Sequence, residues 1–329
     1  MTTLPRRSLL GAGAALIVSP LATPALAQPK WPSRPVQMIC PWAAGGGTDA
    51  VVRIVATLLE KELGQPFNVV NRTGGSGVVG HTALATSAAD GYTLGIITSE
   101  ICMLHWQGLT EVTYKNFAPL GLMNNDPPGI QVNSSSPYKT VKDLAEAIKA
   151  STPGKMKASG TGQGGIWHLA LAGWLNAMGL KADHVRWVPS NGAAPAMQDL
   201  AAGGLDFTTC SVPEARAMLD AGRARSLAVM APQRLSAFPD IPTLQEAMGI
   251  GFSAGAMRVI VGPAGLPAEV KAAVEPVLKK VYESKEYQDF MNARGFGLVY
   301  ADAAAAGQEL AKADQVLGDA MKAAGLAKA

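Results

Sequence analysis

A glycine-rich loop in the first fifth of the chain could bind an anion without a cationic side chain. Gly45, Gly46 and Gly47 follow the apolar residues 36–40 and precede a stretch with helical periodicity that ends at Gly64. Glycines let a solute approach the backbone, and the N-terminus of the helix presents unpaired amide groups. The same residues would also suit a plain strand-to-helix turn, and for one loop alone this alternative stays open.

A second loop of the same kind follows and favours a site. Residues 67–71 predict a strand, Gly75 and Ser76 lie in the glycine-rich stretch behind it, and a helix is expected over residues 80–89. The carboxyl ends of parallel strands share one edge of a sheet, where open α/β sheets bind ligands. We therefore expect both loops to contribute to one binding site.

Further side chains are predicted at the same edge. A third strand over residues 93–98 would end at the hydroxyl groups of Thr98 and Ser99. Trp42, just before the first loop, offers a flat apolar surface that suits an organic acid, although a tryptophan there could also be core. We assign these three residues to the ligand site.

The second half of the chain repeats the order strand, polar loop and helix. Strands are predicted over residues 156–158, 185–188 and 207–210, each followed by a loop. Their edge should face the first one and leave a cleft between two domains. The residues expected to line this far side are Thr161, Gly162, His168, Ser190 and Cys210.

A secreted hydrolase is the alternative function. Ser76 lies between two glycines, but Val78 occupies a position where a GxSxG elbow needs glycine, and Cys210 could pair with His168 without any supporting motif. Residues 45–47 lack the GxGxxG spacing of a dinucleotide site, and no histidine or cysteine spacing matches a metal site. We therefore expect no enzyme activity, no cofactor and no metal.

Residues 1–27 are typical of an export signal. Arg6 and Arg7 precede an apolar run too short to span a bilayer, and residues 25–27 have the small-x-small form of a cleavage site. Cleavage after Ala27 would leave a periplasmic protein, exported by the twin-arginine or the general secretory route. Loss of the two arginines lowers the formal charge from +3 to +1, which gives no indication of nucleic-acid binding.

The remaining chain is long enough for two α/β domains. Of the 329 residues of the full sequence, 48% are hydrophobic and only 16% are charged, as expected for packed cores rather than disorder. The polar and proline-rich residues 124–128 mark a crossing between domains. We predict domain 1 from residues 28–128 plus 253–329 and domain 2 from residues 129–252, each a mainly parallel sheet flanked by helices.

Four motifs, taken in order, resemble the receptors of tripartite tricarboxylate transporters, the Bug-type periplasmic solute-binding proteins. They are Pro-Trp-Ala-Ala-Gly-Gly-Gly-Thr-Asp at 41–49, Asn-Arg-Thr-Gly-Gly-Ser-Gly at 71–77, Asp-Gly-Tyr-Thr-Leu at 90–94 and Phe-Pro-Asp-Ile-Pro-Thr at 238–243. The resemblance implies a two-domain venus-flytrap fold, the type II periplasmic-binding-protein fold, that holds a small organic carboxylate between the loop edges. It also implies that amides of the two first-domain loops grip the carboxylate, and that membrane permease subunits are the partner.

Two departures from the family pattern leave the ligand class open. Residues 190–192 lack the lysine that many relatives have before the glycine, and Cys210 replaces an acidic or amide residue. A monocarboxylate or an aromatic acid therefore competes with a dicarboxylate or tricarboxylate. We expect a monomer, and a sensor protein is the alternative partner to a permease.

Overall fold

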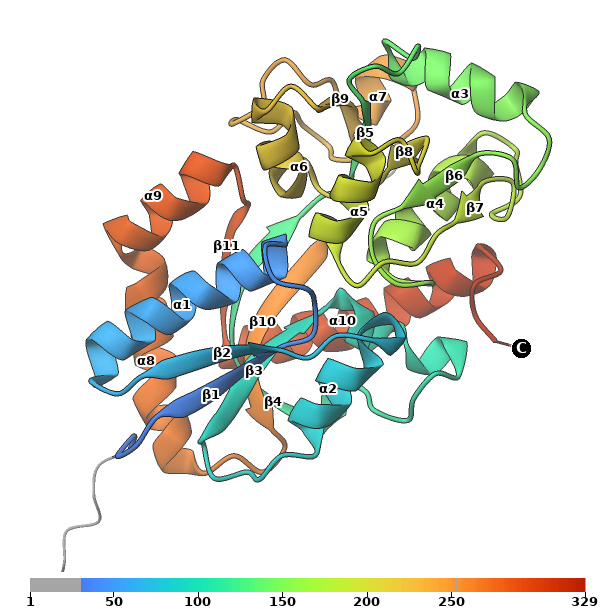
Figure 1. The fold of residues 1–329 in the computed structure, drawn as a ribbon. Helices are drawn as coiled ribbons and strands as arrows, with labels where there is room; N and C mark the ends of the chain where they lie inside the picture. Colours follow the sequence, from blue (N-terminus) through green and yellow to red (C-terminus); the bar gives the residue numbers. More distant parts are fainter. Residues whose placement is uncertain (1–30, 252–253, 329) are drawn as a thin grey trace, which may run out of the picture. The chain divides into compact units, whose positions relative to one another are not determined.

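A computed structural model describes residues 31–251 and 254–328, which form two β-sheets with helices packed against them (Figure 1). The predicted export signal over residues 1–27 lies outside the described residues. Within the described ranges, no helix combines the length and the apolar character that a membrane crossing requires.

The first sheet has six strands in the order β11-β4-β10-β3-β1-β2. β1 pairs in parallel with β2 and β3, whereas β10 runs antiparallel to β3 and β4, and β11 antiparallel to β4. The sheet is mixed rather than mainly parallel because β10 re-enters it from the second sheet in the opposite direction. The strands are β1 (Val36–Cys40), β2 (Phe67–Asn71), β3 (Thr93–Thr98), β4 (Phe117–Asp126), β10 (Ala256–Pro263) and β11 (Leu298–Asp302).

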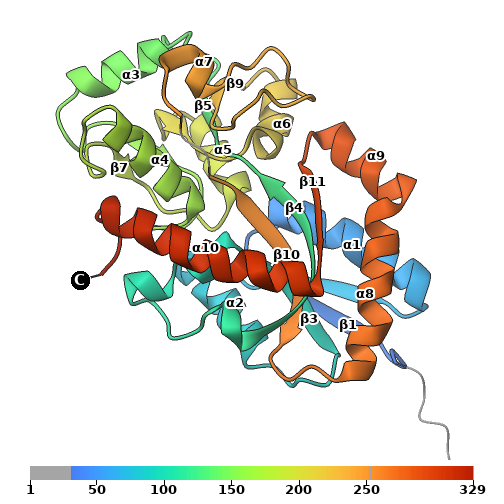
Figure 2. The same ribbon diagram turned by 180° about the vertical axis from the view of Figure 1, so that it is seen from behind.

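Side-chain alternation gives this sheet two apolar faces. Met38 and Ile96 belong to one core cluster, while their neighbours Ile39 and Ile97 belong to another on the opposite face. The first face is covered by α1, α8 and α9, and the second by α2 and α10 (Figures 1 and 2). These helices are α1 (Gly47–Leu63), α2 (Val78–Ala85), α8 (Ala268–Glu283), α9 (Lys285–Arg294) and α10 (Ala303–Ala323).

The second sheet has five short strands in the order β7-β6-β8-β5-β9, and it is also mixed. Capping boxes begin α3, α6 and α7, since in each a hydroxyl and the acidic residue three positions later satisfy backbone amides reciprocally. The strands are β5 (Gly129–Asn133), β6 (Lys157–Ser159), β7 (Arg186–Trp187), β8 (Phe207–Thr208) and β9 (Ala224–Val229). The helices are α3 (Val141–Ala150), α4 (Ile166–Ala177), α5 (Ala193–Ala201), α6 (Val212–Asp220) and α7 (Leu244–Met248).

The long helix α10 crosses one face of the first sheet and ends near α4 (Figure 2). It has side chains in the cores of both sheets. Ala306 and Leu310 pack with the first sheet, whereas Met321 packs with the core of the second. The sequence assigned all of α10 to the first domain. The domain limits stay a prediction, and the structure adds that α10 links the two cores.

Most of the predicted elements in the first sheet are confirmed. Strands 36–40, 67–71 and 93–98 have the predicted bounds, and α1 ends at Gly64, whose φ of 72° is left-handed. The helix expected over residues 80–89 ends earlier, at Ala85. It stops there because the hydroxyls of Thr86 and Ser87 bond to carbonyl groups of the preceding turn.

Candidate functional site

The carboxylate of Asp49 holds the first glycine-rich loop. Gly45 donates its backbone N–H to Asp49 Oδ2 at 2.9 Å, and Arg53 and Asn71 donate to the same carboxylate at 2.8–3.0 Å. Burial raises the pKa of Asp49, but these hydrogen bonds outweigh burial and leave the pKa below its ordinary value. The Gly45 amide is therefore occupied, and the Gly46 amide donates to the carbonyl of Ala43 at 3.4 Å, so the candidate amides for an anion are those from Gly47 onward, at the start of α1.

A small cavity lies at the start of α1, between the two sheets. Its volume is about 20 Å³, which is room for about one water molecule. It gathers predicted residues from both halves of the chain, namely Trp42, Gly46, Gly47, Thr98 and Thr161. Residues that the sequence did not single out complete much of the lining: Thr48, Glu100, Ile166, Gly192, Glu214 and Arg258.

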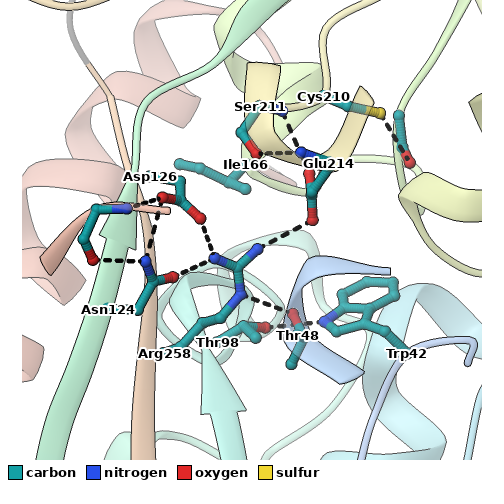
Figure 3. A network of polar contacts seen from close by, with 12 residues as sticks. Trp42, Thr48, Thr98, Asn124, Asp126, Ile166, Cys210, Ser211, Glu214 and Arg258 are labelled. Carbon is teal, nitrogen blue, oxygen red and sulfur yellow. Dashed lines mark hydrogen bonds and ion pairs between the residues drawn. The ribbon is translucent and has the colours of Figure 1, made fainter. Parts of the chain in front are cut away.

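Arg258 of β10 places a buried guanidinium group at this cavity (Figure 3). Its Nε donates to Thr48 at 3.0 Å, its Nη1 to Asn124 and Asp126 of β4, and its Nη2 to Glu214 at 2.9 Å. Burial alone would lower the pKa of Arg258, but Asp126 and Glu214 outweigh burial and raise it. Arg258 is therefore a fixed positive charge between the sheets.

Glu214 reaches this site from α6 of the second sheet. One oxygen accepts from Arg258, and the other accepts from the backbone N–H of Ser211 at 3.2 Å within the capping box. A Cβ atom at Gly47 would lie only 2.7 Å from Glu214 Oε1, so the carboxylate rests against the first glycine-rich loop. Burial raises the pKa of Glu214, against the lowering effect of Arg258.

Glu100 makes the reciprocal contact, from the first sheet to the second. Its Oε1 accepts from the backbone N–H of Ile166 at 3.1 Å, at the positive end of α4. Its other oxygen accepts from the Thr98 hydroxyl. The Thr98 hydroxyl itself accepts from Trp42 Nε1 at 3.1 Å (Figure 3). Thr161 Oγ1 is buried and has no hydrogen-bond partner among the described residues. The cavity thus retains one unsatisfied hydroxyl group.

The second glycine-rich loop lies apart from this cavity. Gly75 and Ser76 line a separate cavity of about 390 Å³, together with Gln107 and Gly164. The loop packs against the second half of the chain, since a Cβ atom at Gly162 would lie 2.5 Å from Ser76 Cβ. The two loops that we expected to hold one carboxylate therefore line different cavities in this structure.

His168 of α4 lines a third and larger cavity, of about 730 Å³, with Lys181 and Trp187. Its Nδ1 accepts from the backbone N–H of Gly164 at 3.0 Å, and its ring stacks on Trp187 with the ring centres 4.7 Å apart. Burial lowers the pKa of His168 to about 4, so the ring is neutral at pH 7. This cavity is lined by none of the first-half glycines, whereas the small cavity at α1 brings Gly46 and Gly47 together with the buried Arg258 and is the candidate site.

The predicted hydroxyls of Ser99 and Ser190 both bond to the backbone. Ser99 Oγ donates to the carbonyl of Gly255 and accepts from the N–H of Met257, each at 2.9 Å, and so ties β3 to β10. Ser190 Oγ donates to the carbonyl of Gly192 at 2.9 Å. Neither residue lines the small cavity.

Cys210 is buried and does not favour a hydrolase. Its Sγ donates weakly to the carbonyl of Gly160 at 3.7 Å, and burial raises the pKa of the thiol well above its ordinary value. The reactive form of a cysteine is the thiolate, which this environment disfavours. The described residues also contain no group of three side chains that could hold a metal ion.

The charged residues of the site are not among those predicted from the sequence. Arg258 interrupts the apolar run of β10, and an arginine in a buried strand requires buried partners, so its position was a usable signal. Glu214 stands three residues after Ser211, which is the capping-box spacing. Their pairing joins residues 44 positions apart, which no local pattern reveals.

Known proteins share both the sequence pattern and the fold of this chain. Residues 51–326 match the model of a family described as "Tripartite tricarboxylate transporter family receptor". The protein BugT of Bordetella pertussis is 29% identical over 283 residues, covering 84% of this chain and 86% of that protein. The solved structure of the periplasmic binding protein BugD is 27% identical, with a TM-score of 0.85 over 91% of this chain and 100% of that one.

A further solved structure, from R. palustris and described as "with adipate", is 26% identical, with a TM-score of 0.85 over 90% of this chain and 99% of that one. These neighbours confirm the predicted fold class, that of the two-domain periplasmic binding proteins, with each sheet mixed. Since the family model matches most of the chain, the protein belongs to the tripartite tricarboxylate transporter receptor family.

Proposed function

We propose that this protein is an exported receptor that captures a small organic carboxylate between its two sheets and delivers it to a membrane transporter. The observation that carries the proposal is the cavity at the start of α1, where a helix N-terminus meets the buried guanidinium of Arg258. Both groups favour a carboxylate. The adipate described for the R. palustris relative supports the same ligand class.

Capture requires the two sheets to separate and close again. A cavity of about 20 Å³ has no room for an acid of adipate's size. Opening would break contacts between the two halves, among them the hydrogen bond from the backbone N–H of Ala43 to the carbonyl of Asn191 at 2.8 Å and that from Gln107 Nε2 to the carbonyl of Gly164 at 3.2 Å. The crossing from β4 to β5 would act as a hinge.

In the proposed receptor, residues from both halves of the chain surround the ligand. The backbone of Gly46 and Gly47 faces the ligand, with Trp42, Thr98 and Thr161 around it. Gly75 and Ser76 of the second loop would join the site only after a rearrangement, because they line another cavity here. We further propose that the protein works in the periplasm as a monomer and has no enzyme activity. Its domain 1 would comprise residues 28–128 plus 253–329, and its domain 2 residues 129–252.

A thermal-shift screen of residues 28–329 tests the proposal. The probes are succinate, adipate, citrate and benzoate, which span dicarboxylates, a tricarboxylate and an aromatic acid. At least one acid should raise the unfolding temperature, because a ligand that binds only the folded state stabilises it by mass action. Turnover of a model ester combined with no shift by any acid would contradict the receptor function.

Gly46→Asp tests the position of the site. The new carboxylate would stand at the N-terminus of α1 and repel the acid found in the screen, so we expect its affinity to fall by about tenfold or more. Gly46→Asn has the same shape without the charge and serves as the matched control. Equal affinities of the two variants would show that the acid does not bind at this loop.

A further inference from the structure

The carboxylate of Glu214 stands where we expect an anion to bind. It contacts Arg258 Nη2 at 2.9 Å, and it lies against Gly47 at the first residue of α1. Gly47 leaves space for it, since a Cβ there would lie 2.7 Å from Glu214 Oε1 and 2.6 Å from Arg258 Nη2. A helix N-terminus and a guanidinium together are an anion subsite that is built into the fold.

We propose that Glu214 holds the place of the ligand's carboxylate in the closed, ligand-free protein, and that the ligand replaces Glu214 at Arg258 and the start of α1. This inference rests on the proposed function and adds to it the residue that recognises the acid. Arg258 becomes the ligand-binding cation, and Glu214 becomes an internal competitor.

The partners of Arg258 divide between the two sheets. Asp126 and Asn124 are on β4, the neighbour of β10, and stay beside Arg258 when the sheets part. The backbone N–H of Gly297 donates to Asp126 at 2.7 Å and holds it further. Glu214 is on α6 of the second sheet and leaves with it. Opening therefore frees Nη2, the nitrogen nearest to Gly47.

The exchange conserves charge and leaves Glu214 with a partner. One carboxylate replaces another, so the sum of charges around Arg258 does not change. When the first oxygen of Glu214 dissociates from Arg258, the second oxygen still accepts the hydrogen bond from the backbone N–H of Ser211, which is 3.2 Å long here. Burial raises the pKa of Glu214, which means that its buried charge is costly and that release to water is favoured.

Chemical rescue tests the subsite without knowledge of the natural acid. Glu214→Ala removes the internal carboxylate and leaves Arg258 and Gly47 in place. Sodium acetate should then raise the unfolding temperature of this variant by several degrees more than sodium chloride of equal concentration. The wild-type protein should show no such difference, because Glu214 already fills the subsite.

Glu246→Ala is the matched control. Glu246 is the third residue of α7 in an equivalent capping box, and it also pairs with an arginine, Arg234, but at the exposed surface. Acetate should not stabilise this variant beyond chloride. If acetate stabilises Glu214→Ala no more than Glu246→Ala, the subsite at Arg258 is refuted.

Glu214→Gln covers the case in which the alanine variant does not fold. Its amide keeps the shape of the side chain but competes less well for Arg258, so the affinity for the best acid of the screen should rise by about tenfold. An unchanged or weaker affinity would overturn the inference. If the wild-type protein binds none of the acids, the proposed function fails, while the acetate experiment still decides on the subsite.

Discussion

One buried guanidinium joins the two sheets at the level of single residues. Arg258 of the first sheet is shared between Asp126 of its own sheet and Glu214 of the other, and all three side chains are almost fully buried. Removing one partner of a buried ion pair leaves a charge without water and without a counter-charge. This arrangement therefore stabilises one relative position of the sheets and makes that position sensitive to whatever competes for Arg258.

The close contact at Gly47 predicts a large effect from one methyl group. In Gly47→Ala, the new Cβ would lie 2.6–2.8 Å from Arg258 Nη2 and from two atoms of Glu214, so these buried, paired side chains or the loop itself must shift. We expect the free energy of unfolding to fall by about 1–3 kcal/mol, as for other overpacked positions. Urea denaturation measures this change.

Gly46→Ala is the control for that substitution. Gly46 has a φ of −83° and caps the same helix, and the nearest atom to its added Cβ would be 3.5 Å away. Gly46→Ala should lower the free energy of unfolding by less than about 1 kcal/mol. A loss of stability that is equal in the two variants would mean that the contact with Glu214 does not constrain the sheets.

At the level of elements, α10 gives the second sheet an anchor that comes from the C-terminal end of the chain. Met321 is fully buried in the core of the second sheet, while Val316 on the same helix is 56% exposed. Met321→Ala should lower the free energy of unfolding by about 2–5 kcal/mol, because it leaves a cavity in that core. Val316→Ala should change it by no more than about 0.5 kcal/mol. Thermal or urea unfolding of both variants checks this, and similar losses would show that the end of α10 is not docked.

How far the sequence predicts these elements depends on whether the signal is local. The strand, loop and helix around residues 36–64 follow from apolar periodicity and from Gly64, and all lie close together in the chain. The contact between Arg258 and Thr48 joins residues 210 positions apart. The position of the second loop likewise depends on its packing against Gly162, which is distant from it in the sequence. No period or spacing encodes such contacts, so the sequence predicted the loops but not the cavities that they line.

At the level of the whole molecule, each half of the protein buries a neutral histidine. His81 of α2 is held by the carbonyl of Gly77 at 2.8 Å and accepts from the backbone N–H of Thr98 at 3.4 Å. His168 lies on α4 in the second half. Burial lowers the pKa of both histidines from an ordinary value of 6.5 to about 4. Stability should therefore depend on pH below the ordinary histidine pKa of 6.5.

The sign of this dependence follows from proton binding. Between pH 6.5 and 4 the unfolded chain protonates His81 and His168 while the folded protein keeps them neutral, so acidification favours unfolding. We expect the free energy of unfolding to fall by on the order of 2 kcal/mol for each histidine between pH 7.5 and 4.5. Burial raises the pKa of Glu214 and of Asp314, and these two groups offset part of the loss because their folded forms bind protons more readily. Urea denaturation at several pH values in this range gives the slope of the free energy of unfolding against pH. This slope should be shallower for His81→Gln than for the wild-type protein, and shallowest for the double variant with His168→Gln. Equal slopes in all three proteins would assign the acid sensitivity to other groups.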